Sequence, residues 1–109
     1  LVVIGDGPEA ARVRAVARAN VTLLGHLPRA DLIGWLRRAR GFVFAAEEDF
    51  GIAPVEAMAC GTPVVAYGRG GALETVTAQT GVFFDEQTAP AIVTAVADLD
   101  ARLAAGEVT

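Results

Sequence analysis

The sequence predicts an α/β fold in which a doubly wound parallel sheet is covered by helices on both faces, in three layers. Short, almost continuous apolar stretches alternate along the chain with longer segments of helical periodicity. Strands that are apolar on both faces are typical of parallel sheets joined by right-handed crossovers. Ligands of such sheets bind at the carboxyl ends of the strands, where the candidate ligand loops of this chain lie.

The apolar stretches give five expected strands. They lie at residues 1–5, 21–24, 42–45, 63–67 and 82–84. These short and almost continuous apolar runs are typical of strands in a parallel sheet. The first expected helix, at residues 9–19, has Ala10, Val13 and Ala17 on one side.

Two further helices have clear apolar faces. One begins near Asp31, a residue type favoured at N-caps, and its apolar stripe is Leu32, Trp35, Leu36 and Ala39. The other, at residues 89–105, is expected to cover the sheet and to end at Gly106. Its apolar stripe is Ile92, Val96, Leu99 and Leu103.

The most informative stretch runs from Glu48 to Glu56, across an expected helix start near Ile52. A helix start presents unpaired backbone N–H groups and a partial positive charge, so a diphosphate can bind there without a lysine. Pro54 suits the first turn because it lacks an N–H group and its φ is already helical. Glu56 follows one turn after Ile52 and points back toward the helix start, where it could accept hydrogen bonds from ribose hydroxyls. Glu48 would reach the opposite end of the same ligand.

The two glutamates are separated by seven residues and enclose Phe50-Gly51-Ile52; residues 56–66 read Glu-Ala-Met-Ala-Cys-Gly-Thr-Pro-Val-Val-Ala. This pattern resembles the donor-binding half of retaining, GT-B-type glycosyltransferases of family 4, the glycosyl transferases group 1. The likeness covers nearly the whole chain, because residues 5–8 resemble the family's glycine turn and residues 70–76 its late Gly-Gly-x-x-Glu loop. It implies that residues 1–109 form a single Rossmann-like, nucleotide-sugar-binding domain of a two-domain enzyme.

The resemblance implies roles for individual residues. Glu48 would orient the donor sugar through its hydroxyls and is the candidate catalytic residue, and Glu56 would hold the ribose. Backbone N–H groups from Gly51 to Ala53 would stabilise the negative charge that grows on the diphosphate as the glycosidic bond breaks. The expected donor-binding residues are Phe50, Gly51, Ile52, Ala53, Glu56, Leu27, Gly5 and Gly7.

Both glutamates also have simpler explanations. A glutamate such as Glu56 in a first helical turn is favoured by the helix dipole alone. Without the surrounding motif, a structural role and a functional role for Glu56 would be about equally well supported. Glu48 is flanked by Glu47 and Asp49, and a run of acids on a loop is usually just solvated. The chemistry of the three acids does not choose among them, and only the register of the resemblance selects Glu48.

The implied reaction moves a sugar from a nucleoside diphosphate donor to a hydroxyl acceptor with retained anomeric configuration and without a metal or other cofactor. Residues 48–52 and 67–71 resemble mannosyltransferases most, which makes GDP-mannose the expected donor and a UDP-sugar the alternative. The acceptor, a glycan, lipid or small molecule, would bind a separate N-terminal domain.

Two elements of the family pattern are absent from this sequence: the N-terminal domain, and the Arg and Lys near the first strand that clamp the diphosphate. The sheet is therefore expected to lack its first, central strand, which would leave a gap or invite pairing between chains. We accordingly expect the 109 residues alone to show little or no transferase activity.

Composition fits one compact domain, since 109 residues with 53% hydrophobic and 20% charged side chains suffice for a single core. The net charge is -4 and the nine basic residues are dispersed arginines, which disfavours nucleic-acid binding. No apolar run reaches the length of a transmembrane segment and no leader resembles a signal peptide. We expect a cytoplasmic protein. The whole enzyme could also bind peripherally to the inner face of the membrane.

The alternative from another functional class is a non-catalytic nucleotide-binding module, which could use the same helix start and both glutamates. Residues 5–10 also fit the loose G-x-G-x-x-A dinucleotide pattern, but the next strand leaves through residues 25–28, which offer no acid to hold a ribose. A phosphoacceptor receiver would need an aspartate after the third strand and a later lysine. This chain has Ala45-Ala46 there and no lysine.

Overall fold

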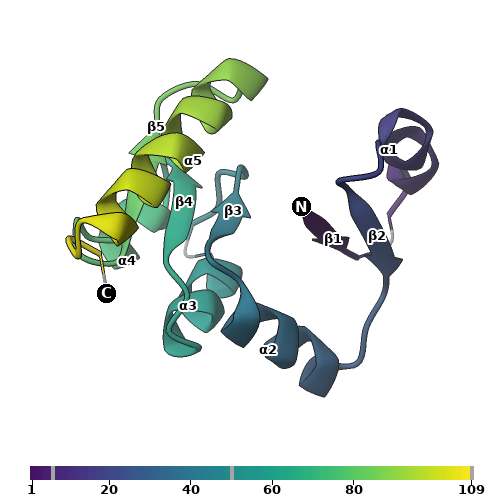
Figure 1. Cartoon of the computed structure of the whole chain (residues 1–109), viewed down its shortest axis with the longest axis horizontal. Helices are drawn as coiled ribbons and strands as arrows, with labels where there is room; N and C mark the ends of the chain where they lie inside the picture. The colour runs from purple at the N-terminus through teal and green to yellow at the C-terminus, as the bar shows by residue number, and fades with distance from the viewer. Residues whose placement is uncertain (6, 50, 109) are drawn as a thin grey trace. The chain divides into compact units, whose positions relative to one another are not determined.

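A computed structural model describes residues 1–5, 7–49 and 51–108, and in it strands and helices alternate along the chain (Figure 1). The chain divides into two compact units, Leu1–Trp35 and Leu36–Thr109. In chain order the elements are β1 (Val2–Ile4), α1 (Ala10–Val16), β2 (Thr22–Gly25), α2 (Arg29–Arg38), β3 (Phe42–Phe44), α3 (Ile52–Ala59), β4 (Val64–Tyr67), α4 (Ala72–Thr75), β5 (Gly81–Phe84) and α5 (Ala89–Ala104). All strand pairs formed by the described residues are parallel, which confirms the predicted α/β class.

In the first unit, β1 and β2 form a two-stranded parallel sheet in which Val2 lies opposite Thr22. The helix between them, α1, ends at Val16, and the prediction of a helix to residue 19 is wrong. No residue of α1 is buried. A helix of seven residues without a buried face is held mainly by its own backbone bonds, and such short helices are marginal.

The start of α2 also differs from the prediction. The carbonyl of Pro28 accepts hydrogen bonds from the N–H groups of Asp31 and Leu32, at 3.0 and 3.1 Å, so the helix begins before Asp31. Asp31 therefore lies in the first turn and is not the N-cap. An acidic residue is favoured at both places, because either one puts its carboxylate near the positive end of the helix dipole.

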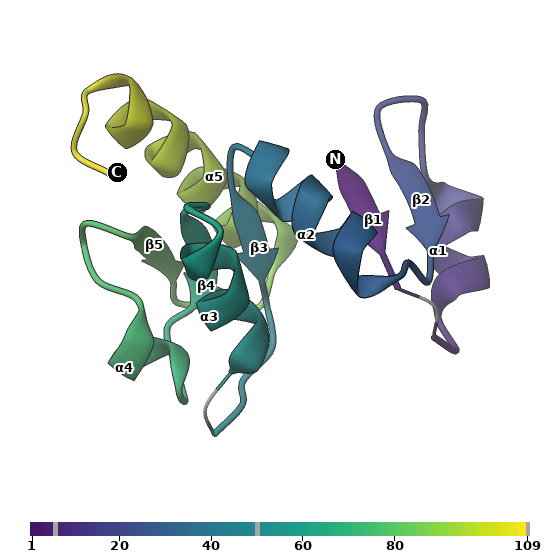
Figure 2. The same ribbon diagram turned by 90° about the horizontal axis from the view of Figure 1, so that it is seen from below.

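In the second unit, β4 is the middle strand of the sheet β3-β4-β5. Its residues Val64, Val65 and Ala66 are almost fully buried. The helices α3 and α5 both contact β4, and they lie on opposite sides of the strands (Figure 2). This arrangement produces the predicted layers of helix, sheet and helix, and explains why the sequence of β4 is apolar on both faces.

The core between the sheet and α5 is built from Val65, Val82, Phe84, Ala95, Leu99 and Val108. Val96, predicted to face this core, is 42% exposed, and Ala95 occupies the inner position instead. Both residues are apolar, so periodicity alone did not separate them. The helix ends as predicted, because Gly106 (φ 75°) follows it and the N–H of Glu107 donates to the carbonyl of Arg102 at 2.9 Å.

The sequence predicts one sheet, whereas the described strands form two. No strand pairing among the described residues joins β1 or β2 to β3, β4 or β5. The expectation of a single domain over residues 1–109 stays a prediction. None of the helices in the described part of the chain has the length and apolar character needed to cross a membrane.

The exposure of Val96 gives a test of the core assignment. Leu99→Ala should lower the free energy of unfolding by roughly 2–5 kcal/mol, because it leaves a cavity where a buried side chain was. Val96→Ala should change it by less than about 1 kcal/mol, since it removes little buried surface and alanine is the better helix former. Urea denaturation of both variants measures the difference. Equal losses would show that Val96 is part of the core.

Candidate functional site

The segment between β3 and α3 carries the central motif. Gly51 is the N-cap of α3, with φ 82° and ψ 79°, in the left-handed region that residues with a Cβ rarely adopt. A Cβ at this position would lie 3.7 Å from Pro54 and 3.8 Å from the Phe44 ring, which are ordinary contacts. The backbone angle, and not a lack of space, is therefore what requires glycine here. The helix begins at Ile52, which confirms the predicted start.

The first turn of α3 has the properties that anion binding needs. Gly51 has no side chain that could cap the helix, and the first turn contains no acidic residue, so the prediction that Glu56 lies in the first turn is wrong. Ile52 is 66% exposed, whereas the side chain of Pro54 is fully buried and anchors the first turn of α3 in the interior of the second unit. Of the residues at this helix start, Ile52 is exposed, Ala53 is half-buried and Gly51 is buried. No N-cap side chain covers the N–H groups of Ile52 and Ala53.

The two glutamates occupy different environments around this turn. Glu48 lies on the loop before α3 and is exposed, and its backbone carbonyl accepts a hydrogen bond from Gly71 at 2.6 Å. Glu56 is half-buried on α3, one turn after Ile52. Phe50, expected to bind the donor, lies outside the described residues. Glu48, Gly51, Ile52, Ala53 and Glu56 all follow β3 within the second unit.

A second loop reaches the same segment. After β4, the N–H of Gly68 donates to the carbonyl of Phe84 at 2.9 Å, and the short helix α4 follows from Ala72. Gly71 of this loop makes the hydrogen bond to Glu48 described above. A third loop, after β5, supplies Gln87, whose Nε2 donates to the carbonyl of Ala45 at 2.7 Å. The loops after three adjacent parallel strands therefore meet at one edge of the sheet.

In the sequence, Gly70 and Gly71 of the loop after β4 stand out only as part of a family pattern, and nothing predicts a role for Gln87. A glutamine after a strand carries no signal by itself. The contact between Gln87 and Ala45 depends on which strands are neighbours, and this becomes visible only once the order β3-β4-β5 is known.

The remaining predicted site residues lie in the first unit. Gly5 follows β1 with φ 125° and donates to the carbonyl of Gly25 at 2.7 Å. The carbonyl of Gly7 accepts from Ala10 at 3.0 Å, at the start of α1. Leu27 follows β2 and is half-buried. All three lie in loops at the carboxyl ends of β1 and β2, and their assignment to the donor site stays a prediction.

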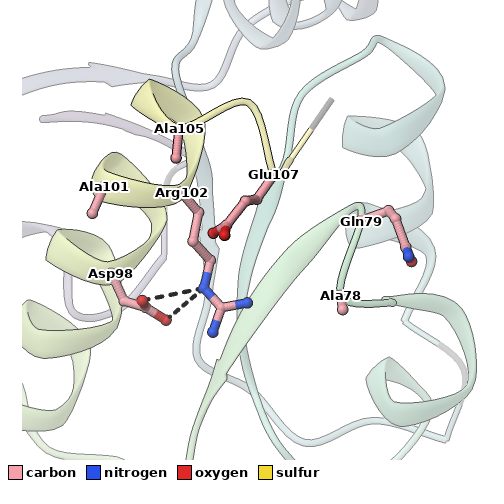
Figure 3. Close-up of a pocket in the computed structure, with 7 residues that line it drawn as sticks. All are labelled: Ala78, Gln79, Asp98, Ala101, Arg102, Ala105 and Glu107. Carbon is pink, nitrogen blue, oxygen red and sulfur yellow. Dashed lines mark hydrogen bonds and ion pairs between the residues drawn. The ribbon is translucent and has the colours of Figure 1, made fainter.

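A surface depression of about 670 Å³ lies in the second unit, and none of the predicted site residues lines it (Figure 3). It is lined by Ala78, Gln79, Asp98, Ala101, Arg102, Ala105 and Glu107. Within it, Nε of Arg102 lies 3.1 Å from a carboxylate oxygen of Asp98, so the charge of each is already compensated. Ala78 and Gln79 precede β5, which places this depression toward the amino end of that strand, away from the edge where the three loops meet.

Among residues 1–5, 7–49 and 51–108, no three His, Cys, Asp or Glu side chains are grouped so that they could hold a metal ion. The expectation of a reaction without a metal remains a prediction. The three acids on the loop after β3, Glu47, Glu48 and Asp49, are all exposed.

Comparison with known proteins places this geometry in context. A protein-family model described as glycosyl transferases group 1 matches residues 1–101. The chain is 39% identical over 93 residues to a GDP-mannose-dependent monoacylated alpha-(1-6)-phosphatidylinositol monomannoside mannosyltransferase of Corynebacterium glutamicum, a match that covers 75% of this chain and 24% of that protein.

Two other relatives have similar coverage. A GDP-mannose-dependent alpha-(1-6)-phosphatidylinositol monomannoside mannosyltransferase of Mycolicibacterium smegmatis is 45% identical over 86 residues, which is 76% of this chain and 22% of the relative. A 2-deoxystreptamine glucosyltransferase of Streptomyces kanamyceticus is 39% identical over 80 residues, which is 68% of this chain and 21% of the relative. The matches thus span less than a quarter of the length of each of these relatives.

The left-handed conformation at Gly51 makes a prediction about stability. Gly51→Ala should lower the free energy of unfolding by roughly 1–2 kcal/mol, the cost of a left-handed residue with a Cβ. Gly51→Asn should lose less, because asparagine tolerates this conformation better. Urea denaturation measures both. If alanine and asparagine proved as stable as glycine, the backbone angle would not be the reason for glycine at this position.

Proposed function

The chain belongs to the glycosyl transferases group 1 family, and we propose that it is the donor-binding half of a retaining glycosyltransferase that moves a sugar from a nucleoside diphosphate to a hydroxyl acceptor. One observation carries the proposal: a helix that begins at the exposed Ile52, directly after the left-handed Gly51, lies between Glu48 and Glu56 in the sequence. This arrangement supplies an anion site with a carboxylate on either side in the sequence.

The diphosphate is proposed to bind at the first turn of α3. The N–H groups of Ile52 and Ala53 would donate to its oxygens, and Gly51 would let the phosphates approach the backbone closely. In an oxocarbenium-like transition state, negative charge grows on the departing diphosphate. Fixed N–H donors stabilise that charge more than the ground state, and in other enzymes the loss of one such donor costs on the order of a hundredfold to a thousandfold in rate.

The glutamates would bind the sugar rings at the two ends of the donor. Glu56 is half-buried one turn into α3, from where its carboxylate would accept hydrogen bonds from the ribose hydroxyls. Glu48 is exposed on the loop after β3 and would bind the hydroxyls of the transferred sugar. Leu27, with neighbouring backbone, is proposed to line the part of the site that receives the base. Gly5, Gly7 and Phe50 are proposed as further donor-binding residues.

GDP-mannose is the proposed donor. The support for this choice is that two of the relatives are named as GDP-mannose-dependent mannosyltransferases. A UDP-sugar is the alternative, and a third relative is named for the transfer of a different sugar, glucose, without a named nucleotide.

The proposal extends to the whole protein in three respects. The acceptor, a glycan, lipid or small molecule, would bind to a different domain. No metal or other cofactor is included, because backbone N–H groups supply the charge compensation for the diphosphate. The enzyme would act in the cytoplasm or at the inner face of the membrane.

Calorimetric titration of the whole protein with GDP-mannose and with GDP tests the two carboxylates separately. Glu56→Ala should lower the affinity for both ligands by roughly tenfold or more, because both contain the ribose and the variant loses a hydrogen bond to a charged group. Glu48→Ala should lower the affinity for GDP-mannose by a similar factor and leave the affinity for GDP unchanged, since only GDP-mannose carries the sugar.

Asp49→Ala is the matched control, because Asp49 is the exposed acid next to Glu48. It should leave both affinities unchanged. Unaltered binding in the Glu48 and Glu56 variants would contradict the site. Tight binding of GDP-mannose without transfer of the sugar to any of a panel of glycan, lipid and small-molecule hydroxyl acceptors would instead favour the non-catalytic nucleotide-binding module.

A further inference from the structure

Glu48 belongs to a segment without regular structure. Residues 45–49 lie between β3 and α3, and residues 46–49 are exposed to solvent. Such a segment does not fix the direction of a side chain by its own backbone pairing. Its conformation therefore depends on bonds that other parts of the second unit make to it.

Two hydrogen bonds of this kind hold the segment, one at each end. Nε2 of Gln87 donates to the carbonyl of Ala45 at 2.7 Å, where the chain leaves β3. The N–H of Gly71 donates to the carbonyl of Glu48 itself at 2.6 Å. The first bond comes from the loop after β5 and the second from the loop after β4.

The approach of Gly70 to Glu48 is closer than any other residue type permits. Gly70 has φ 71°, and a Cβ built on it would overlap the carbonyl oxygen of Glu48. The same Cβ would lie 3.2 Å from the backbone nitrogen of Glu48 and 3.2 Å from Cγ of Glu47. Any side chain at position 70 would therefore push the backbone of Glu48 away from its present place.

The loop that carries Gly70 is itself held in place. It follows the buried strand β4, Gly68 donates to the carbonyl of Phe84 at 2.9 Å, and Gly71 is buried. Since the sheet supports this loop on one side and α4 continues it on the other, a steric conflict at position 70 would be relieved by movement of the exposed segment 46–49.

We propose that Gly70, Gly71 and Gln87 are positioning residues that set the backbone of Glu48 and thereby determine how strongly the protein binds the sugar of its donor. This inference rests on the proposed function, in which Glu48 binds that sugar. The three residues act through the Glu48 backbone and need not touch the donor.

A shift of the Glu48 backbone should affect the binding of the sugar and not that of the nucleoside diphosphate. Displacement of Glu48 weakens the contact with the sugar, whereas the start of α3 and Glu56 continue to bind the nucleoside diphosphate. The ratio of the affinity for GDP-mannose to that for GDP therefore reports on the position of Glu48. A general loss of stability lowers both affinities together and leaves this ratio unchanged.

Gly70→Ala in the whole protein tests this, with GDP-mannose and GDP titrated by calorimetry. The ratio should fall by about tenfold, the effect expected from one lost hydrogen bond to a charged group. Gly106→Ala is the matched control, because Gly106 has φ 75° and a Cβ there would meet nothing within 4 Å. It carries the same backbone strain without a contact to Glu48, and it should leave the ratio unchanged.

A second pair of variants avoids the risk that Gly70→Ala fails to fold. Gln87→Ala removes the bond to Ala45 from an exposed side chain and should lower the ratio by about threefold to tenfold, the cost of one neutral hydrogen bond. Gln79→Ala, at an exposed glutamine on the loop before β5, is its control and should have no effect on the ratio.

Glu48→Ala distinguishes a failure of the positioning role from a failure of the proposed donor site. If Glu48→Ala lowers the ratio while Gly70→Ala and Gln87→Ala leave it unchanged, the positioning role is wrong and the proposed donor site stands. If Glu48→Ala leaves the ratio unchanged, Glu48 does not bind the sugar, and the proposed function fails together with the positioning role.

Discussion

The burial of β4 between two helices is the constraint on which the second unit depends. Val64 and Ala66 are wholly inaccessible and Val65 nearly so, which requires a strand that is apolar on both faces and paired on both edges. Parallel pairing with β3 and β5 then brings the ends of three strands to one edge of the sheet. The loops that leave this edge carry Glu48, Gly70 and Gln87, so the core strand also determines the geometry of the candidate site.

Charge plays a smaller part in this architecture than backbone geometry. Two ion pairs of the second unit, Arg40 with Asp100 and Arg102 with Asp98, lie on exposed surfaces, where such pairs contribute little to stability. The proposed anion site would instead use the N–H groups at the start of α3, which the helix and the left-handed Gly51 orient. In this proposal a chain without lysine would bind a diphosphate through its backbone.

Much of the fold could be predicted from the sequence, because the relevant signals are local. The apolar strands, the helix start at Ile52 and the end of α5 before Gly106 all follow from periodicity and from terminal residues. The predictions were wrong where tertiary packing decides which residues are buried and where a helix ends. Periodicity does not distinguish Val96 from Ala95 as the inner residue, and it does not show that α1 has no buried face and ends early. The contacts of Gly70 and Gln87 with the segment around Glu48 join residues about 20 to 40 positions apart, and no local pattern encodes them.

The absence of any buried residue in α1 has a consequence for local unfolding. The amide hydrogens of α1 should exchange with solvent through openings that cost little free energy, whereas those of β4 should exchange only when the second unit opens as a whole. Gly7 accepts a hydrogen bond from the first residue of α1, so a nucleotide that contacts this turn would slow exchange there first. Binding of such a nucleotide would thus appear as slower amide exchange in α1.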